Sequence, residues 1–107
     1  MALKVRNLFS ERNNRWEVKL MGELDIETSS ELKEKINEML EQQNTSIIIN
    51  AEELEYLDST GLGMLIGVLK RLKSDENDLV IVNAKPSILK LFTITGLNKV
   101  FTLRDEQ

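Results

Sequence analysis

The sequence predicts an α/β protein with a mixed β-sheet and helices packed against it. Two segments of alternating apolar and polar residues open the chain, which is typical of an antiparallel hairpin. Two uninterrupted β-branched runs follow further along, and amphipathic segments with helical spacing separate and follow them. Strands that alternate with helices need parallel crossover connections. The expected order is therefore β-β-α-β-α-β-α, with a short optional strand at the end.

Composition excludes several classes of function. The 107 residues suggest one domain, 1–107, that can bury a core. The absence of cysteine and histidine excludes disulfides, thiolate metal sites and a Ser-His-Asp triad. The net charge is −4 without a basic patch, and no stretch reaches the length of a membrane span. We expect a cytoplasmic monomer with no metal or cofactor, no nucleic-acid partner and no membrane partner.

Two strands and a turn account for the beginning of the chain. The first strand is expected from Leu3 to about Phe9. The second strand is expected over residues 16–21, and residues 22–25 leave it. Asn13 and Asn14 supply the turn chemistry between the two strands.

The next segment predicts a surface helix and a central strand. Residues 28–31 fit a capping box, in which Thr28 bonds the N–H of residue 31 and Glu31 reaches back. One apolar stripe then predicts an amphipathic helix that ends near residues 42–44. The stripe consists of Leu32, Ile36, Met39 and Leu40. The run at 46–50 suits a strand covered on both faces, and the acidic segment 51–57 is expected to be a connection.

The second half of the chain predicts two more helices around another strand. A helical run follows Asp58, and residues 79–82 are a second buried strand. The apolar residues of the run are Leu62, Leu65, Ile66, Leu69 and Leu72. Pro86 fits the first position of a third helix, and Gly96 fits its C-cap. The apolar face of that helix consists of Ile88, Leu89 and Phe92. The last apolar patch is expected from Leu97, Val100 and Phe101, beside a short edge strand.

Three consecutive polar residues, Asp58, Ser59 and Thr60, give the strongest functional signal. Each is a good N-cap residue and contributes about 0.5–2 kcal/mol relative to alanine. A helix needs one such cap, so capping explains one of the three residues. The other two are candidates for chemistry at the start of the helix.

The glycines of the same helix also need an explanation. A glycine inside a helix costs about 1 kcal/mol relative to alanine, and Gly61, Gly63 and Gly67 all fall within this run. Gly63 and Gly67 share one face, which either packs against the sheet or receives a partner. We expect a partner-binding surface that includes all three glycines, Leu62 and the adaptable Met64.

Two enzymatic interpretations of this segment fail on the residues present. A phosphate-binding loop lacks its lysine, because Val68 and Leu69 follow Gly67, and Asp58 would repel a nucleotide phosphate. A hydrolase nucleophile elbow needs G-x-S-x-G around the serine, which Ser59 does not have. Measurable nucleotide turnover by the pure protein would revive this class.

The motifs resemble those of bacterial anti-sigma factor antagonists of the STAS type. The matching residues, in chain order, are 22–25 (Gly-Glu-Leu-Asp), Thr28, 58–63 (Asp-Ser-Thr-Gly-Leu-Gly), 92–97 (Phe-x-x-Thr-Gly-Leu) and Phe101. The resemblance extends over almost the whole chain, and the segment 58–63 is its most specific part. It implies a STAS-like fold.

The resemblance also implies a partner-switching cycle. The anti-sigma factor is an ATP-dependent serine kinase that phosphorylates the serine after the aspartate, which is Ser59 here. The unphosphorylated antagonist binds this kinase and releases a sigma factor, and a PP2C-type phosphatase resets the phosphorylated form. Asp25 and Asp58 match positions close to the acceptor, and Thr60 is a secondary candidate for modification.

Two questions stay open at this point. One is whether the cycle serves a stress response, sporulation or another branch of sigma factor regulation. The other is an alternative role, in which the chain is a non-switching STAS subunit of a signalling scaffold or of a lipid-transport complex.

Overall fold

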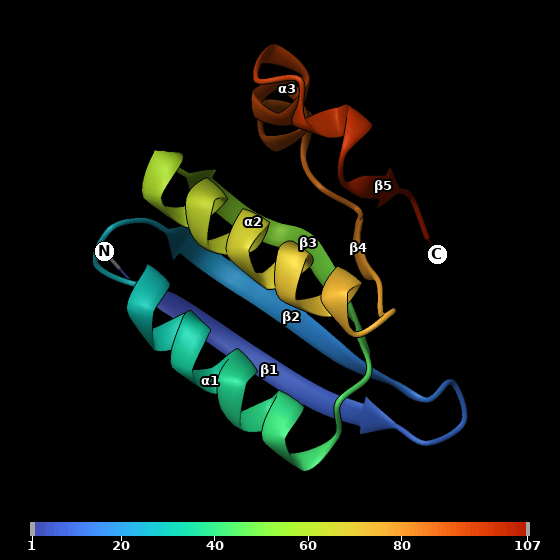
Figure 1. The fold of residues 1–107 in the computed structure, drawn as a ribbon. Coiled ribbons are helices and arrows are strands. Elements are labelled where there is room, and N and C mark those ends of the chain that lie inside the picture. Colours follow the sequence, from blue (N-terminus) through green and yellow to red (C-terminus); the bar gives the residue numbers. More distant parts are fainter. Residues whose placement is uncertain (1, 107) are drawn as a thin grey trace.

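The computed structural model describes residues 2–106 and contains one five-stranded sheet in the order β1-β2-β3-β4-β5 (Figure 1). The strands are β1 (Leu3–Ser10), β2 (Arg15–Leu24), β3 (Ser46–Leu57), β4 (Leu79–Val82) and β5 (Thr102–Arg104). The β1–β2 pair is antiparallel and the three other pairs are parallel. The predicted hairpin, the crossovers and the short last strand are confirmed.

Three helices and one 3₁₀ turn complete the fold. They are α1 (Ser29–Gln42), α2 (Ser59–Ser74), α3 (Pro86–Ile94) and η1 (Leu97–Lys99). Figure 1 shows α1 and α2 side by side over the same face of the sheet. Pro86 begins α3 as expected, and Gly96 follows that helix with the left-handed φ of 78° that glycine adopts without strain.

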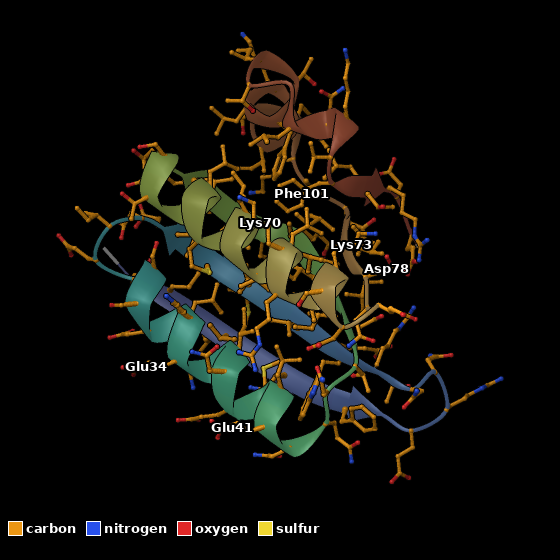
Figure 2. All side chains as sticks on the ribbon, viewed as in Figure 1. Glu34, Glu41, Lys70, Lys73, Asp78 and Phe101 are labelled. Atoms are coloured by element: carbon orange, nitrogen blue, oxygen red, sulfur yellow. The ribbon has the colours of Figure 1, made fainter. Side chains whose placement is uncertain are left out.

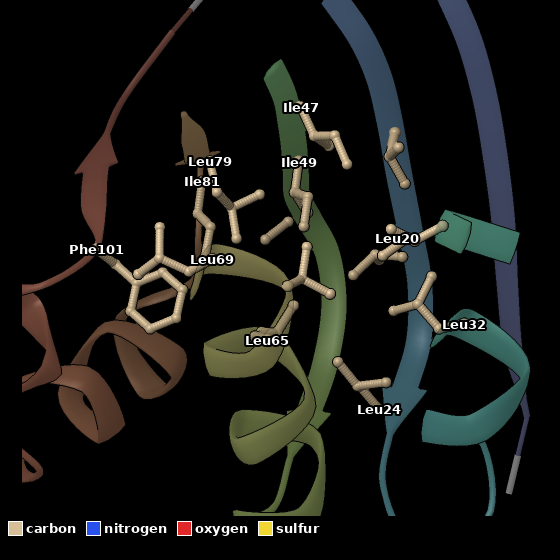
Figure 3. Close-up of a cluster of buried hydrophobic side chains, with 14 of the residues drawn as sticks. Leu20, Leu24, Leu32, Ile47, Ile49, Leu65, Leu69, Leu79, Ile81 and Phe101 are labelled. Atoms are coloured by element: carbon tan, nitrogen blue, oxygen red, sulfur yellow. The ribbon is translucent and has the colours of Figure 1, made fainter. Parts of the chain in front are cut away.

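One hydrophobic core fills the space between the helices and this face of the sheet (Figure 3). The predicted stripe of α1 is buried in it, together with Ile88 and Phe92 of α3. The Trp16 indole N–H donates to the backbone carbonyl of Gln43 at 3.0 Å and so ties the end of α1 to β2. Phe92 and Phe101 meet edge to face with ring centroids 5.2 Å apart. Trp16 is thus a core residue.

The acidic segment 51–57 was expected to be a connection, but it is the second half of β3. The expectation is wrong because β2 continues to Leu24 and pairs with this segment as far as Leu57. Ala51, Leu54 and Leu57 are buried while the glutamates between them are exposed. Because β3 extends to Leu57, the residues that follow it begin at the carboxyl end of this central strand.

The sheet has one face that the helices do not cover. Every strand residue of the core cluster faces the helices, whereas Ile48 and Val82 lie outside that cluster. The expectation that residues 46–50 form a strand covered on both faces agrees with the burial of Ile47, Ile48 and Ile49, which are 1%, 7% and 2% exposed, although the helices cover only one of the two faces. The last apolar patch is smaller than expected, because Phe101 is buried but Val100 is 56% exposed.

The helix surfaces that face away from the sheet carry charge. Glu34 and Glu41 of α1 are exposed and point away from the sheet (Figure 2). Lys73, in the last turn of α2, forms an ion pair with Asp78 at 2.7 Å. None of the helices within residues 2–106 combines the length and the apolar character needed to cross a bilayer.

Candidate functional site

The predicted phosphate-acceptor segment lies where β3 ends and α2 begins. Asp58 is the N-cap of α2, and its Oδ1 atom accepts a hydrogen bond from the N–H of Gly61 at 2.9 Å. Capping therefore uses Asp58. Ser59 and Thr60 are exposed at the positive end of the helix, and the Ser59 hydroxyl has no hydrogen-bond partner within residues 2–106.

Asp58 also joins this segment to the loop after β2. Its Oδ2 atom accepts from the N–H of Ile26 at 3.2 Å, and its own N–H donates to the carbonyl of Leu24 at 3.2 Å. The Ile26 side chain is 72% exposed beside the start of α2. Ile26 was not among the predicted site residues, although one large apolar residue between Asp25 and Glu27 was a signal for it in the sequence.

Asp25 supports the loop around Ile26 and does not reach towards solvent. It is 6% exposed, and its Oδ1 atom accepts from the N–H groups of Glu27 at 2.9 Å and Thr28 at 3.0 Å. The Thr28 hydroxyl accepts from the Asp25 N–H at 3.0 Å and lies 2.8 Å from the carbonyl of Glu23. The predicted capping box is wrong, because this turn occupies the Thr28 hydroxyl and no side chain caps α1.

Two of the predicted contact residues face the interior. A Cβ atom on Gly61 would lie 2.7 Å from the carbonyl oxygen of Leu24 and 2.9 Å from the Cδ1 atom of Leu57. Leu62 is buried in the core. Both residues are thus packed inside the protein, and their predicted place in the partner-binding surface stays a prediction. Close packing on the sheet explains Gly61.

The other two glycines of α2 face open space. A Cβ atom on Gly63 or Gly67 would meet nothing within 4 Å. Packing against the sheet therefore does not explain these two residues. Both line a groove of about 400 Å³ between α1 and α2, which Met64 also lines.

The groove runs from the acceptor segment along the two helices. Ile26 and Thr60 line it at the end near Ser59, and the Arg71 guanidinium donates to the Asn37 side chain at 2.6 Å farther along. The structure thus brings Ile26, Met64 and the two open glycines onto one surface beside the exposed serine. No cluster of three or more acidic side chains within residues 2–106 is placed to hold a metal ion.

Comparison with known proteins identifies relatives over nearly the full chain. The model of the STAS domain family matches residues 10–106. An anti-sigma-B factor antagonist of Staphylococcus aureus (strain NCTC 8325 / PS 47) is 39% identical over 90 residues, which cover 84% of this chain and 83% of the relative.

Two solved SpoIIAA structures have the same fold. The anti-sigma factor antagonist SpoIIAA in its unphosphorylated form has a TM-score of 0.76 and 25% identity, over 97% of this chain and 90% of the other. The Bacillus cell fate determinant SpoIIAA in the phosphorylated form has a TM-score of 0.74 and 26% identity, over 99% and 92% of the two chains. The predicted fold class and the resemblance are both confirmed.

Proposed function

This chain belongs to the STAS domain family, and from that premise we propose that it is an anti-sigma factor antagonist switched by phosphorylation of Ser59. The observation that carries the proposal is that capping and exposure fall on different residues at the start of α2. Asp58 caps the helix, whereas the neighbouring serine is exposed and its hydroxyl has no partner within residues 2–106. A kinase can therefore reach this hydroxyl without unfolding the helix.

The proposed cycle has three steps. The unphosphorylated protein binds an anti-sigma factor that is also an ATP-dependent serine kinase, and this binding releases a sigma factor. The kinase then phosphorylates Ser59, and the complex dissociates. A PP2C-type phosphatase restores the first state. A regulator of this kind acts in the cytoplasm as a monomer and catalyses no reaction itself. The existence of SpoIIAA structures in unphosphorylated and phosphorylated forms supports a cycle of this type.

Electrostatics explains how phosphate would act at this position. Phosphorylation adds about −1.5 to −2 charges at neutral pH. The helix N-terminus attracts this charge, but the adjacent Asp58 carboxylate repels it. At a separation of roughly 6 Å and an effective dielectric of about 20–40, each unit-charge pair contributes about 1.5–3 kcal/mol before screening. Binding would have to desolvate this charge beside Asp58 in the interface, and a loss of about 3–4 kcal/mol from that cost weakens a complex several-hundred-fold.

The surface beside Ser59 is the proposed contact area for the kinase. Gly63 and Gly67 let another backbone approach α2 closely, because no side chain covers this part of the groove. Met64 is flexible and half-buried, and Ile26 offers a mostly exposed apolar side chain. An apolar anchor next to a flat surface is a common arrangement at the centre of an interface.

Intact mass spectrometry tests the acceptor assignment. The purified protein is incubated with ATP and a candidate anti-sigma serine kinase from the same genome. We expect the mass of one phosphate on the wild type and on Thr60→Ala, and none on Ser59→Ala. A phosphate that persists on Ser59→Ala would overturn the assignment. A wild type that binds the kinase stably but is never phosphorylated would instead favour the non-switching subunit.

Binding measurements test the switch itself. Ser59→Asp places a negative charge at the acceptor position and is expected to lose most of its affinity for the kinase, while its melting temperature stays within a few degrees of the wild type. Ser59→Asn is the matched uncharged control and is expected to bind more tightly than Ser59→Asp. Equal affinity of Ser59→Asp and wild type would show that charge at this position is not the switch.

A further inference from the structure

The face of the sheet opposite the helices contains a shallow hollow of about 600 Å³. All of its lining residues belong to strands or loops, so it is separate from the groove beside Ser59. Ile48 and Val82 lie in its apolar part, and Arg6, Arg15 and Lys19 are its cations. This surface plays no part in the proposed phosphorylation switch.

The sequences of the two central strands are those of strands covered on both faces. Residues 47–49 of β3 and 79–82 of β4 are apolar without interruption, which is typical of parallel strands between two layers. Ile48 is 7% and Val82 is 3% exposed, although both lie outside the core cluster under the helices. Both side chains are therefore buried in the floor of the hollow, and Leu8, which is 64% exposed, is the lining residue that presents open apolar surface.

The cations of the hollow are not fully balanced by the chain itself. Arg15 pairs with Glu17 at 3.1 Å, and Lys19 pairs with Glu53 at 2.6 Å. Arg6 lies directly opposite Lys19 in the β1–β2 register and forms no ion pair within residues 2–106. Like charges directly opposite each other destabilise an antiparallel pair. An anion bound between them would remove this repulsion.

The cations of this face also act on the carboxylate of Glu53. The pKa of Glu53 is lowered, chiefly by the hydrogen bond and the charge of Lys19, and further by the charges of Arg6 and Lys85. Three cations thus act on one carboxylate, which neutralises one of them. A second anionic group would be attracted to the same place.

We propose that this hollow binds a small amphipathic carboxylate, a molecule with one negative group and an apolar body. The volume lies within the range of about 300–1,000 Å³ that small-molecule sites occupy. The apolar body would lie along the exposed Leu8 side chain, over the floor formed by Ile48 and Val82, and the carboxylate would accept charge-assisted hydrogen bonds from Arg6 next to Lys19. One unpaired guanidinium matches a ligand with a single charge.

An NMR titration of the full chain with decanoate tests this site, at concentrations below micelle formation. We expect saturable shifts of the backbone amide signals of Ile48, Val82 and their neighbours. Decanol lacks the charge and acetate lacks the apolar body, so both should bind much more weakly. Arg6→Gln keeps a polar side chain without the charge and is expected to lower decanoate affinity roughly tenfold. Arg12→Gln removes an exposed cation outside the hollow and should bind like the wild type.

Three outcomes would overturn the proposal. The first is the absence of saturable shifts. The second is a set of shifts that maps to the groove between α1 and α2 instead of the sheet. The third is equal affinity for decanoate and decanol together with no effect of Arg6→Gln, which would show non-specific apolar adsorption. Each outcome leaves the assignment of Ser59 untouched, because the two surfaces share no lining residue.

Discussion

Gly61 and Gly63 lie two residues apart at the start of α2, but they lack side chains for opposite reasons. A side chain on Gly61 would collide with the backbone of Leu24 in β2, whereas a side chain on Gly63 would enter open space. Residues two apart on a helix face different directions, so one glycine meets the sheet and the other meets solvent. The same short motif therefore serves packing on one side of the helix and recognition on the other.

The division extends to the neighbouring residues. Asp58 and Leu62 are on the inner side with Gly61, because Asp58 caps the helix and Leu62 is part of the core. Ser59 and Gly63 belong to the open side. Substitutions on the inner side are expected to lower the free energy of unfolding, and those on the outer side to weaken binding without lowering this free energy. This contrast can be tested residue by residue.

Gly61→Ala is expected to have the largest effect on stability. The added Cβ would lie within 3 Å of the Leu24 carbonyl oxygen, and a backbone atom cannot move away cheaply. We expect a loss of about 2 kcal/mol in the free energy of unfolding, as for other overpacked sites. Urea denaturation followed by circular dichroism measures it. A variant as stable as the wild type would show that α2 can shift away from β2.

Asp58→Ala is expected to have the next largest effect. It removes the cap on the Gly61 N–H and the acceptor for the Ile26 N–H, at a cost of about 1–1.5 kcal/mol. Asp58→Asn keeps one side-chain oxygen for the cap and should lose less than half as much. The same urea experiment compares the two variants. Equal losses would mean that the negative charge, rather than the hydrogen bond, stabilises the start of α2.

The two open glycines should respond in the opposite direction. Gly63→Ala and Gly67→Ala are each expected to raise the free energy of unfolding by about 0.5–1 kcal/mol, because alanine favours the helix and the added methyl group meets nothing. The same variants should bind the proposed kinase partner less tightly, as measured by calorimetry. Destabilisation by either substitution would contradict the assignment of this face as open.

The fold was predictable where its signals are local, and the error in β3 has a structural cause. Lys19 pairs with Asn50 and Met21 with Glu53, so β3 contains an extra residue between these pairs, and a second irregularity follows. The buried residues of this half, Ala51, Leu54 and Leu57, are consequently spaced by three instead of two. The alternation of apolar and polar residues could not reveal this strand, because two irregularities in its pairing with β2 interrupt the period of two.

The candidate site was predictable in part for a similar reason. Counting N-caps left surplus polar residues at 58–60 as candidates, and the resemblance to anti-sigma factor antagonists then pointed to Ser59 among them. Which glycine faces the sheet depends on the approach of Leu24, a residue 37 positions away from Gly61 in the chain. Ile26 joins the surface through a hydrogen bond to Asp58. Contacts between distant segments leave no local pattern to read.

The smallest expected effect on stability comes from a substitution on the sheet face that the helices do not cover, in contrast to the large effects expected on the packed side of α2. Glu53→Gln removes a carboxylate whose pKa is lowered, first by the Lys19 hydrogen bond. A lowered pKa in the folded state means that the ionised side chain stabilises the folded protein at pH values above the ordinary glutamate pKa of 4.5. This stabilisation is lost as the pH falls through the lowered pKa. The group is exposed, so solvent screens the interaction.

The expected result is therefore a slightly lower urea midpoint for Glu53→Gln than for the wild type at neutral pH, and no difference well below pH 4.5. Added salt should reduce the difference at neutral pH. Glu52→Gln removes a neighbouring carboxylate that forms no ion pair within residues 2–106 and should leave the midpoint unchanged. A difference that grows as pH falls would have the wrong sign and would mean that Glu53 is repelled, not held, by its surroundings in the folded sheet.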